Sequence, residues 1–314
     1  MRRALLGLRI VVTVALLGGV LAAVDLPALG RSLQEASLGY FPLAVGALIV
    51  QTLVLATRFR SNVGALAPPI SAREAIELQF IGALFNQALP SAIGGDAIRA
   101  WRLRSGGRLW REALNAVLLD RAGGVVVLAA LAAVAVSVQH SGVFASLRFA
   151  LWAATAAGVA MLGLVAMAER LPLLPRAARR LLVTSGAPAA ARVLFATRVA
   201  GRTAALSAAS HLLAVLAAYW LAVALGVELA PGTFVAAALC MLLATMIPLS
   251  YAGWGVREAG AVWLLARAGV PTESALALSV LFGAALCVAA LPGVAFWLAP
   301  LRGRVHASSA ELTP

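Results

Sequence analysis

Six ionisable residues lie in or beside apolar stretches of this 314-residue sequence, where charged side chains are uncommon. They are Asp96, Arg99, Asp120, Arg121, Arg257 and Glu258. A charged side chain in hydrocarbon is costly unless it has a partner or water, so each should be paired or should line a polar path. The arginines could bind a phosphate, whereas the acids could neutralise them, bind a cationic group or carry a proton. The pattern therefore indicates a charged-group site inside a membrane.

The first of these charges follows two glycines in the stretch "FNQALPSAIGGDAIRAWRLR". Asp96 comes directly after Gly94 and Gly95 and precedes a helical run, which suits a helix N-cap. Arg99 would lie one turn further on. A helix N-terminus opened by glycines, with an arginine close by, also suits anion binding, and a lipid phosphate is the obvious anion. Both interpretations of Asp96 stay open.

The second charged motif, "NAVLLDRAGGVVVL", lies about two turns into a long apolar run. Adjacent helical residues point about 100° apart, so Asp120 and Arg121 need not pair with each other. Asp120 shares its face with small residues one turn to either side, which lets another helix approach closely. It could then meet Arg99 or Arg257, either as part of a binding site or as a salt bridge that only fixes the packing.

The composition defines the class of protein to which these motifs belong. The chain is 62% hydrophobic and only 12% charged, and its apolar runs approach the length of about 20 residues that a bilayer crossing needs. The runs are continuous rather than alternating, which excludes a closed barrel. The net charge is +13, but the arginines flank apolar runs, where they orient helices and do not indicate nucleic acid. The sequence predicts an all-α, polytopic helical membrane protein.

The apolar runs predict six full spans and two irregular segments. The expected spans are 5–24, 40–57, 113–136, 149–168, 204–225 and 275–299, and the irregular segments are 75–98 and 233–268. The first run could also be a signal peptide, but its length favours an uncleaved span. Arginine bias places both termini, both flanks of 75–98 and the connection 169–203 in the cytoplasm. Segment 75–98 should therefore enter the membrane and turn back, and 233–268 should do so from the other side.

The two irregular segments resemble each other. "LPSAIGGDAIRAW" at 89–101 and "IPLSYAGWGVREAG" at 247–260 each carry a proline, small residues, glycines, then an acid and an arginine. The expected helix-breaking residues are Pro90, Gly94, Gly95, Pro248, Gly253 and Gly255. Interrupted helices at matching places of two inverted halves, here 40–136 and 204–299, point to a transport site. The alternative is that proline and glycine only kink two helices for packing.

The motifs "NQALPSAIGGDAIRAWRL", "LLDRAGG" and "IPLSYAGWGVREAG" resemble those of the lysylphosphatidylglycerol synthase transmembrane-region family. The resemblance runs from about Leu5 to Leu301. It implies a stand-alone, flippase-like protein of a bacterial inner membrane, because the chain leaves no room for the aminoacyl-transferase domain of fused members. The matching positions are Asn86, Pro90, Gly94, Gly95, Asp96 and Arg99, then Asp120, Arg121 and Gly123, then Pro248, Gly253, Gly255, Arg257 and Glu258.

Two functions fit these observations. The first is movement of a phospholipid or lipid-linked headgroup between leaflets through a polar cavity between the two hairpins, with Asn86 and the six charges binding it. The second is a non-catalytic membrane subunit that positions a lipid-modifying enzyme. We expect no enzyme activity, metal or cofactor, because the sequence has no P-loop, its three histidines are scattered and no nucleophile arrangement is visible. Nucleic acid is not an expected partner, and the oligomeric state stays open.

Overall fold

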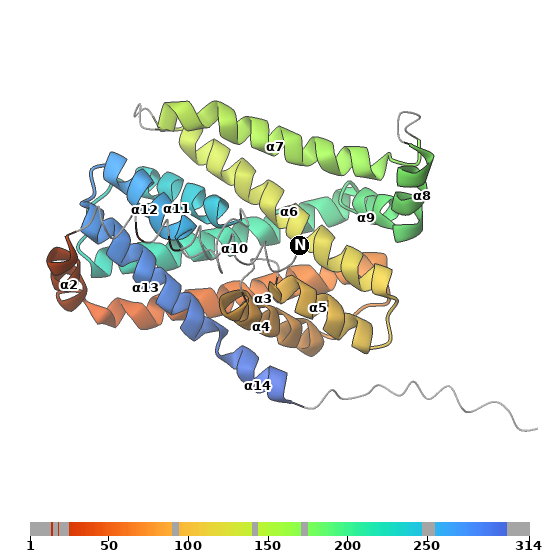
Figure 1. Cartoon of the computed structure of the whole chain (residues 1–314), viewed down its shortest axis with the longest axis horizontal. Coiled ribbons are helices and arrows are strands. Elements are labelled where there is room, and N and C mark those ends of the chain that lie inside the picture. Colours follow the sequence, from red (N-terminus) through yellow and green to blue (C-terminus); the bar gives the residue numbers. More distant parts are fainter. Residues whose placement is uncertain are drawn as a thin grey trace, which may run out of the picture.

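The computed structural model describes residues 14 and 18 and the ranges 25–89, 94–139, 144–170, 175–246 and 255–299. Within these ranges all regular structure is helical (Figure 1). Among the described residues, five helices are long and apolar enough to cross a membrane. They are α3 (Phe41–Leu66, preceded by the 3-10 turn η1, Leu38–Tyr40), α6 (Trp110–Ser137), α7 (Ala145–Ala166), α10 (Thr197–Ala224) and α13 (Thr272–Ala290) with its extension α14 (Pro292–Leu298). The predicted polytopic helical class is confirmed.

These helices correspond to five of the six predicted spans. The expected first span, 5–24, lies outside the described residues except for residues 14 and 18. The prediction for the second span was wrong at its end, because α3 continues from the expected boundary at 57 to Leu66. The last span is not one helix, because Pro292 has no backbone N–H to continue α13 and begins α14 instead.

Both irregular segments contain two short helices packed side by side. The first hairpin consists of α4 (Ala72–Ala88) and α5 (Gly94–Ser105), and the second of α11 (Pro231–Thr245) and α12 (Val256–Arg267). The Ser71 hydroxyl caps α4 by accepting the Glu74 N–H at 3.1 Å. Figure 1 shows the two hairpins in opposite halves of the molecule, the first beside the start of α6 and the second beside the far end of α10. They therefore lie toward opposite ends of the helix bundle.

The halves of the chain pack reciprocally. Helices α3 and α10 lie along each other through the middle of the molecule. Helix α4 of the first hairpin packs on α13 and α14, and helix α11 of the second packs on α6. Gly293 of α14 lies so close to α4 that a Cβ atom there would collide with the Phe80 carbonyl. Each hairpin thus rests on the last long helix of the other half.

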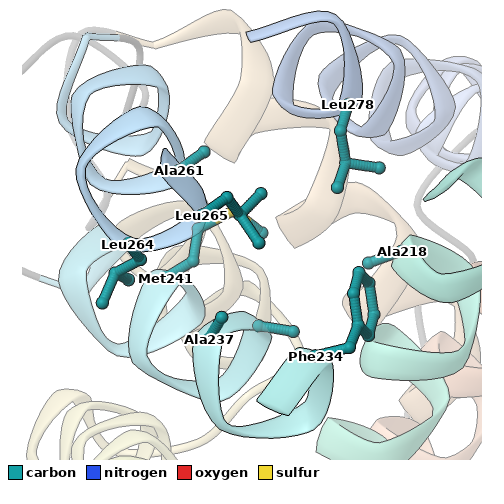
Figure 2. A pocket seen from close by; sticks show the side chains of 9 residues that line it. Ala218, Phe234, Ala237, Met241, Ala261, Leu264, Leu265 and Leu278 are labelled. Carbon is teal, nitrogen blue, oxygen red and sulfur yellow. The ribbon is translucent and has the colours of Figure 1, made fainter. Parts of the chain in front are cut away.

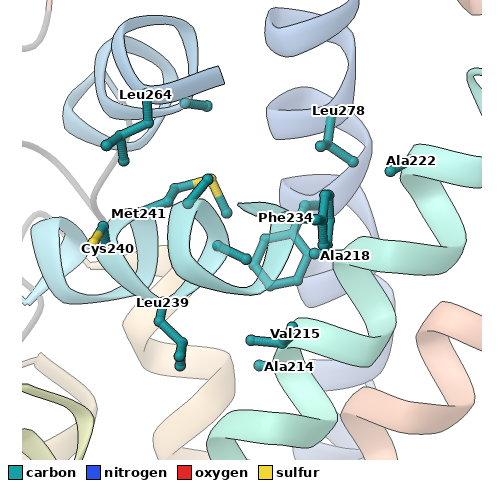
Figure 3. Close-up of a cluster of buried hydrophobic side chains, with 14 of the residues drawn as sticks. Ala214, Val215, Ala218, Ala222, Phe234, Leu239, Cys240, Met241, Leu264 and Leu278 are labelled. Carbon is teal, nitrogen blue, oxygen red and sulfur yellow. The ribbon is translucent and has the colours of Figure 1, made fainter. Parts of the chain in front are cut away.

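Small side chains bring the helices of the larger hydrophobic core together. This core joins α3, α6, α10, α11, α12 and α13, and alanine is its commonest residue. Figure 3 shows Phe234 of α11 against Val215 and Ala218 of α10. Small residues allow close backbone approach where the hydrophobic effect between lipid-facing helices is weak. A second, smaller core around Phe59 and Leu103 holds the first hairpin against α3 and α6.

The long connection 169–203 is largely helical. It holds α8 (Arg176–Ser185), α9 (Ala187–Val193) and the first turns of α10. No residue of α8 is buried, and Leu181 is 70% exposed beside the helix's arginines. A short helix that mixes exposed leucines with arginines has the composition of helices that lie along a membrane surface. At the opposite end of the molecule, α2 (Leu26–Gln34) packs on α13.

Candidate functional site: two buried ionic clusters

Three arginines and two aspartates form a buried network where α3, α5 and α6 meet. We call it the first ionic cluster, and it consists of Arg58, Asp96, Arg99, Asp120 and Arg121. Four of these residues are at most 6% exposed. Their burial is made tolerable by ion pairs and hydrogen bonds that run between the helices.

Asp120 is the centre of the first ionic cluster and is only 1% exposed. Its Oδ1 accepts from Arg58 Nε at 2.9 Å and from Asn62 Nδ2 at 3.1 Å. Its Oδ2 accepts from Arg58 Nη2 at 3.1 Å and from Arg99 Nη2 at 3.2 Å. Of the two arginines that were predicted as possible partners of Asp120, Arg99 is the one in contact, whereas Arg257 pairs with Glu258. With four donors from two helices, this carboxylate fixes α6 to both α3 and α5.

Asp96 bridges the other two arginines. Its Oδ1 accepts from Arg99 Nη1 at 3.1 Å, and its Oδ2 accepts from Arg121 Nη1 at 2.7 Å. It lies in the first turn of α5, which begins at Gly94, so the N-cap interpretation was wrong. The Gly95 N–H, which belongs to the first turn of α5, donates to Asn86 Oδ1 of α4 at 2.9 Å. Asn86 therefore closes the first hairpin, and the Asp96 carboxylate is left for the arginines.

A layer of uncharged polar residues on α3 and α10 completes the network. Arg58 Nη1 donates to Ser207 Oγ at 2.8 Å, and Thr203 Oγ1 donates to Asn62 Oδ1 at 2.9 Å. Arg58, Asn62, Thr203 and Ser207 were not predicted as site residues, because Arg58 follows an apolar run as a flanking charge would. A signal was present: Arg58 and Asn62 are spaced four apart, as are Thr203 and Ser207, so each pair lies on one helix face.

Glycines give the arginines room. A Cβ on Gly124 would lie 2.8 Å from Arg58 Nη1, and one on Gly82 would lie 2.6 Å from Arg99 Cδ. A Cβ on Gly95 would meet the Gly82 carbonyl, and one on Gly94 would lie 2.7 Å from Leu89 Cβ. Gly94 and Gly95 were predicted as helix-breaking residues that open the following helix. They are the first residues of α5, and they also let α5 approach α4 closely.

The first ionic cluster carries an excess of positive charge, because its arginines outnumber its aspartates by one. Arg99 Nε is buried and has no hydrogen-bond partner among the described residues, although the guanidinium lies 4.0 Å from the centroid of the Phe59 ring. The Arg121 side chain is 25% exposed and forms the accessible edge of the cluster. Bidentate, charge-assisted donors with one uncompensated charge can bind an anion such as phosphate.

The second ionic cluster lies between α12 and α13. Arg257 Nη2 donates to Glu258 Oε1 at 2.7 Å, and Ser279 Oγ of α13 donates to the same oxygen at 3.2 Å. Glu258 Oε2 accepts the Gly255 N–H at 2.6 Å and so caps α12. Gly255 has φ +88°, a conformation that favours glycine. Gly283 leaves no room for a Cβ beside Arg257. Its arginine and its glutamate make this cluster neutral.

The cavity against the second hairpin is apolar. It lies between α10, α11, α12 and α13, and Figure 2 shows Met241, Leu265 and Leu278 around it. All nine side chains that line it are hydrophobic, so it does not have the polar character expected of a headgroup cavity. Pro90, Pro248 and Gly253 lie outside the described residues, so their predicted helix-breaking role stays a prediction. Among the described residues no group of three His, Cys, Asp or Glu could hold a metal ion.

Comparison with known proteins places these features in a family context. Residues 5–293 match the family model described as "Lysylphosphatidylglycerol synthase TM region". The match covers both hairpins and both ionic clusters. No curated protein matches the chain.

Proposed function

Because this chain belongs to the lysylphosphatidylglycerol synthase TM-region family, we propose that it moves a phosphate-bearing lipid between the leaflets of its membrane. The chain is a multi-pass membrane protein of a lipid-related family. The observation that carries the proposal is the buried first ionic cluster, with its excess of one positive charge and its accessible edge at Arg121. The proposal assigns no catalytic step to the chain.

The chemistry of the first ionic cluster favours a phosphate over a cationic headgroup. A cation would add to an existing surplus of positive charge, whereas a phosphate diester would neutralise it. Arginine is suited to this task because its planar guanidinium donates to two oxygens at once. In the proposed mechanism the phosphate reaches Arg121 first and then Arg99, while the acyl chains stay in the surrounding lipid.

The arrangement of the two hairpins suggests how access to the site would alternate. They lie toward opposite ends of the helix bundle, and each packs on the last long helix of the other half (Figure 1). Transporters with inverted repeats commonly expose one site to each side in turn by rocking one half against the other. We propose the same motion here, with α3 and α10 as the surface between the halves.

We place the end that carries α8, α9 and the open end of the first hairpin in the cytoplasm, because its arginines follow the positive-inside rule. Both termini would then be cytoplasmic and the protein would lie in the inner membrane. Cysteine labelling tests this orientation. In a background lacking the exposed native Cys287, Ser105→Cys should react only from the cytoplasmic side and Glu228→Cys only from the opposite side. Labelling of both from one side would contradict the assignment.

Reconstitution with labelled phospholipids and a leaflet-specific reporter tests the transport itself. Wild-type protein should exceed empty liposomes, and Arg121→Gln should reduce the rate by roughly tenfold, the effect of losing one charge-assisted hydrogen bond. Arg121 is partly exposed, so this variant should still fold. Arg104→Gln, which changes an exposed arginine of α5, is the matched control and should keep the wild-type rate.

Equal rates for wild-type protein and empty liposomes with every tested lipid would overturn the transport proposal. The non-catalytic role, in which the chain positions a partner lipid-modifying enzyme and its charges only hold helices together, would then be favoured. Equal rates for wild type, Arg121→Gln and Arg104→Gln, all above the empty liposomes, would retain transport but remove the first ionic cluster from it.

A further inference from the structure

We propose that the Asp96 carboxylate occupies the place of the substrate phosphate and must be displaced before a lipid can bind. This inference rests on the proposed function and deepens it, since it identifies the recognised group as a phosphate and assigns Asp96 the role of an internal competitor. It also makes Asp96 different in kind from Asp120, although both are buried aspartates in one network.

The geometry at Asp96 is that of an anion held between two guanidinium groups. Each carboxylate oxygen accepts from a different arginine, Arg99 at 3.1 Å and Arg121 at 2.7 Å. Two oxygens of a phosphate diester offer the same acceptor pattern to the same donors. A lipid phosphate could therefore replace the carboxylate without a change in the kind of bond that either arginine makes.

The two aspartates differ in how firmly they are held. Asp120 accepts four hydrogen bonds from Arg58, Asn62 and Arg99, and it is 1% exposed. Asp96 accepts two, and one of these comes from Arg121, whose side chain is 25% exposed. If Asp96 is withdrawn, three arginines face one aspartate, which leaves two positive charges for the incoming anion. Asp120 would remain in place and hold the helices.

An independent observation is the state of Arg99. Its Nε is buried without a hydrogen-bond partner among the described residues, although such a group normally finds one. The other two nitrogens of Arg99 are already bonded to Asp96 and Asp120. A phosphate has more acceptor sites than a carboxylate and could engage this nitrogen as well. The site thus has an unused donor that its resident carboxylate does not satisfy.

Anion binding by the detergent-solubilised full chain tests the inference. If Asp96 competes with phosphate, its removal must raise the affinity for phosphate instead of lowering it. The variants are Asp96→Asn, which keeps an oxygen acceptor and removes the charge, and Glu77→Gln, a control that changes a carboxylate of a surface ion pair in α4. The probes are inorganic phosphate and dihexanoyl-phosphatidylglycerol, each titrated by calorimetry. Asp96→Asn should bind the phosphate probe roughly tenfold more tightly than wild type does, whereas Glu77→Gln should equal wild type.

The two probes separate a lipid headgroup from a free phosphate as the source of the anion. Tighter binding of phosphatidylglycerol alone assigns the site to a lipid phosphate, and tighter binding of both assigns it to the phosphate group as such. Equal or weaker binding by Asp96→Asn, with wild type binding normally, would overturn this inference while leaving the proposed function intact. Absence of binding by both wild type and Asp96→Asn would overturn both. Thermal unfolding of each variant confirms that it is folded.

Discussion

The two ionic clusters use similar residues in different ways. In the first ionic cluster the charges come from three helices, α3, α5 and α6, and α10 adds two hydroxyl groups. In the second, the arginine and the glutamate are neighbours in α12, and α13 adds one hydroxyl group. Among the described residues, the first ionic cluster therefore couples helices and retains a surplus charge, whereas the second pairs one arginine with one glutamate at the start of a single helix.

This difference shows how two hairpins of similar layout can differ in the chemistry of their charged residues. Each cluster includes an acid and an arginine near the start of the second short helix of its hairpin. Each also places an arginine against a glycine of a long helix, Arg58 against Gly124 and Arg257 against Gly283. The first ionic cluster has surplus positive charge that suits anion binding. The second is suited to capping the start of α12. The variants below test this division, beginning with the largest expected effect.

Removal of Asp120 should have the largest effect on stability. Asp120→Leu removes the carboxylate shared by Arg58 and Arg99 and leaves two buried arginines short of acceptors. Removing one partner of a buried ion pair costs about 3–5 kcal/mol, and we expect the upper end of this range. Thermal or denaturant unfolding in detergent measures it, with Glu228→Gln at an exposed position as the control. A cost no larger than that of the control would show that the first ionic cluster does not hold the helices together.

Removal of Glu258 should cost less and act more locally. Glu258→Leu takes the carboxylate from a single arginine and the cap from the Gly255 N–H. We expect a loss near the lower end of the same range, about 3 kcal/mol. Hydrogen exchange should show the opening concentrated in α12 instead of spreading through α3, α5 and α6. Equal losses and equally widespread exchange for the Asp120 and Glu258 variants would remove the distinction between the clusters.

Alanine at the glycines beside the two arginines should cause smaller, parallel losses. Gly124→Ala would place a Cβ 2.8 Å from Arg58 Nη1, and Gly283→Ala would crowd Arg257 in the same way. Overpacking of this kind typically costs about 1–3 kcal/mol. Gly163→Ala and Gly201→Ala are the controls, because a Cβ at either helical position meets nothing within 4 Å.

The controls should be neutral or slightly stabilising, by up to about 1 kcal/mol, because alanine favours helix more than glycine does. The melting temperature of all four variants gives the comparison. Losses at Gly124 and Gly283 that do not exceed those at Gly163 and Gly201 would mean that the arginines can shift freely, which would contradict a rigid network in both halves.

The sequence predicted much of the fold because the apolar runs and the arginine bias act locally. The two interrupted segments were found from proline, glycine and charge in apolar surroundings. The cost of a buried charge predicted that Asp120 would have an arginine partner, but it left the choice between Arg99 and Arg257 open. The expected end of the second span was wrong because the same rule, that charge is costly in hydrocarbon, was applied to Arg58. Arg58 was assumed to mark the edge of hydrocarbon, whereas Asp120 and Ser207 allow it to lie within the helix bundle.

The other errors concern backbone conformation and the partners of individual side chains. Gly94 and Gly95 were interpreted as residues that interrupt a helix and open the next one, and the additional demand of close packing between α4 and α5 was not foreseen. The choice between an N-cap and an ion pair for Asp96 depended on Arg121 of another helix, which no local pattern reveals. Partners distant in sequence are set by helix packing, and one sequence read alone does not contain that packing.

An ion pair outside the spans provides a reference for both buried clusters and should show the smallest effect. Arg192 donates to both oxygens of Glu169, at 3.0 and 3.3 Å, and this hydrogen bonding, with the positive charge of Arg192, lowers the pKa of Glu169 below its ordinary value. The pair therefore stabilises the fold above the ordinary carboxyl pKa of about 4.3, and this contribution is lost as the pH falls through the lowered pKa. Glu169→Gln, which leaves the bond from Arg192 to the Ala166 carbonyl in place, should be slightly less stable than wild type at neutral pH, and the difference should vanish in acid or in high salt. Melting temperatures across pH and salt check this expectation.

Salt should leave the stability cost of Asp120→Leu nearly unchanged, because buried ion pairs are screened little. Equal salt sensitivity for both variants would mean that water reaches the first ionic cluster as freely as it reaches Glu169.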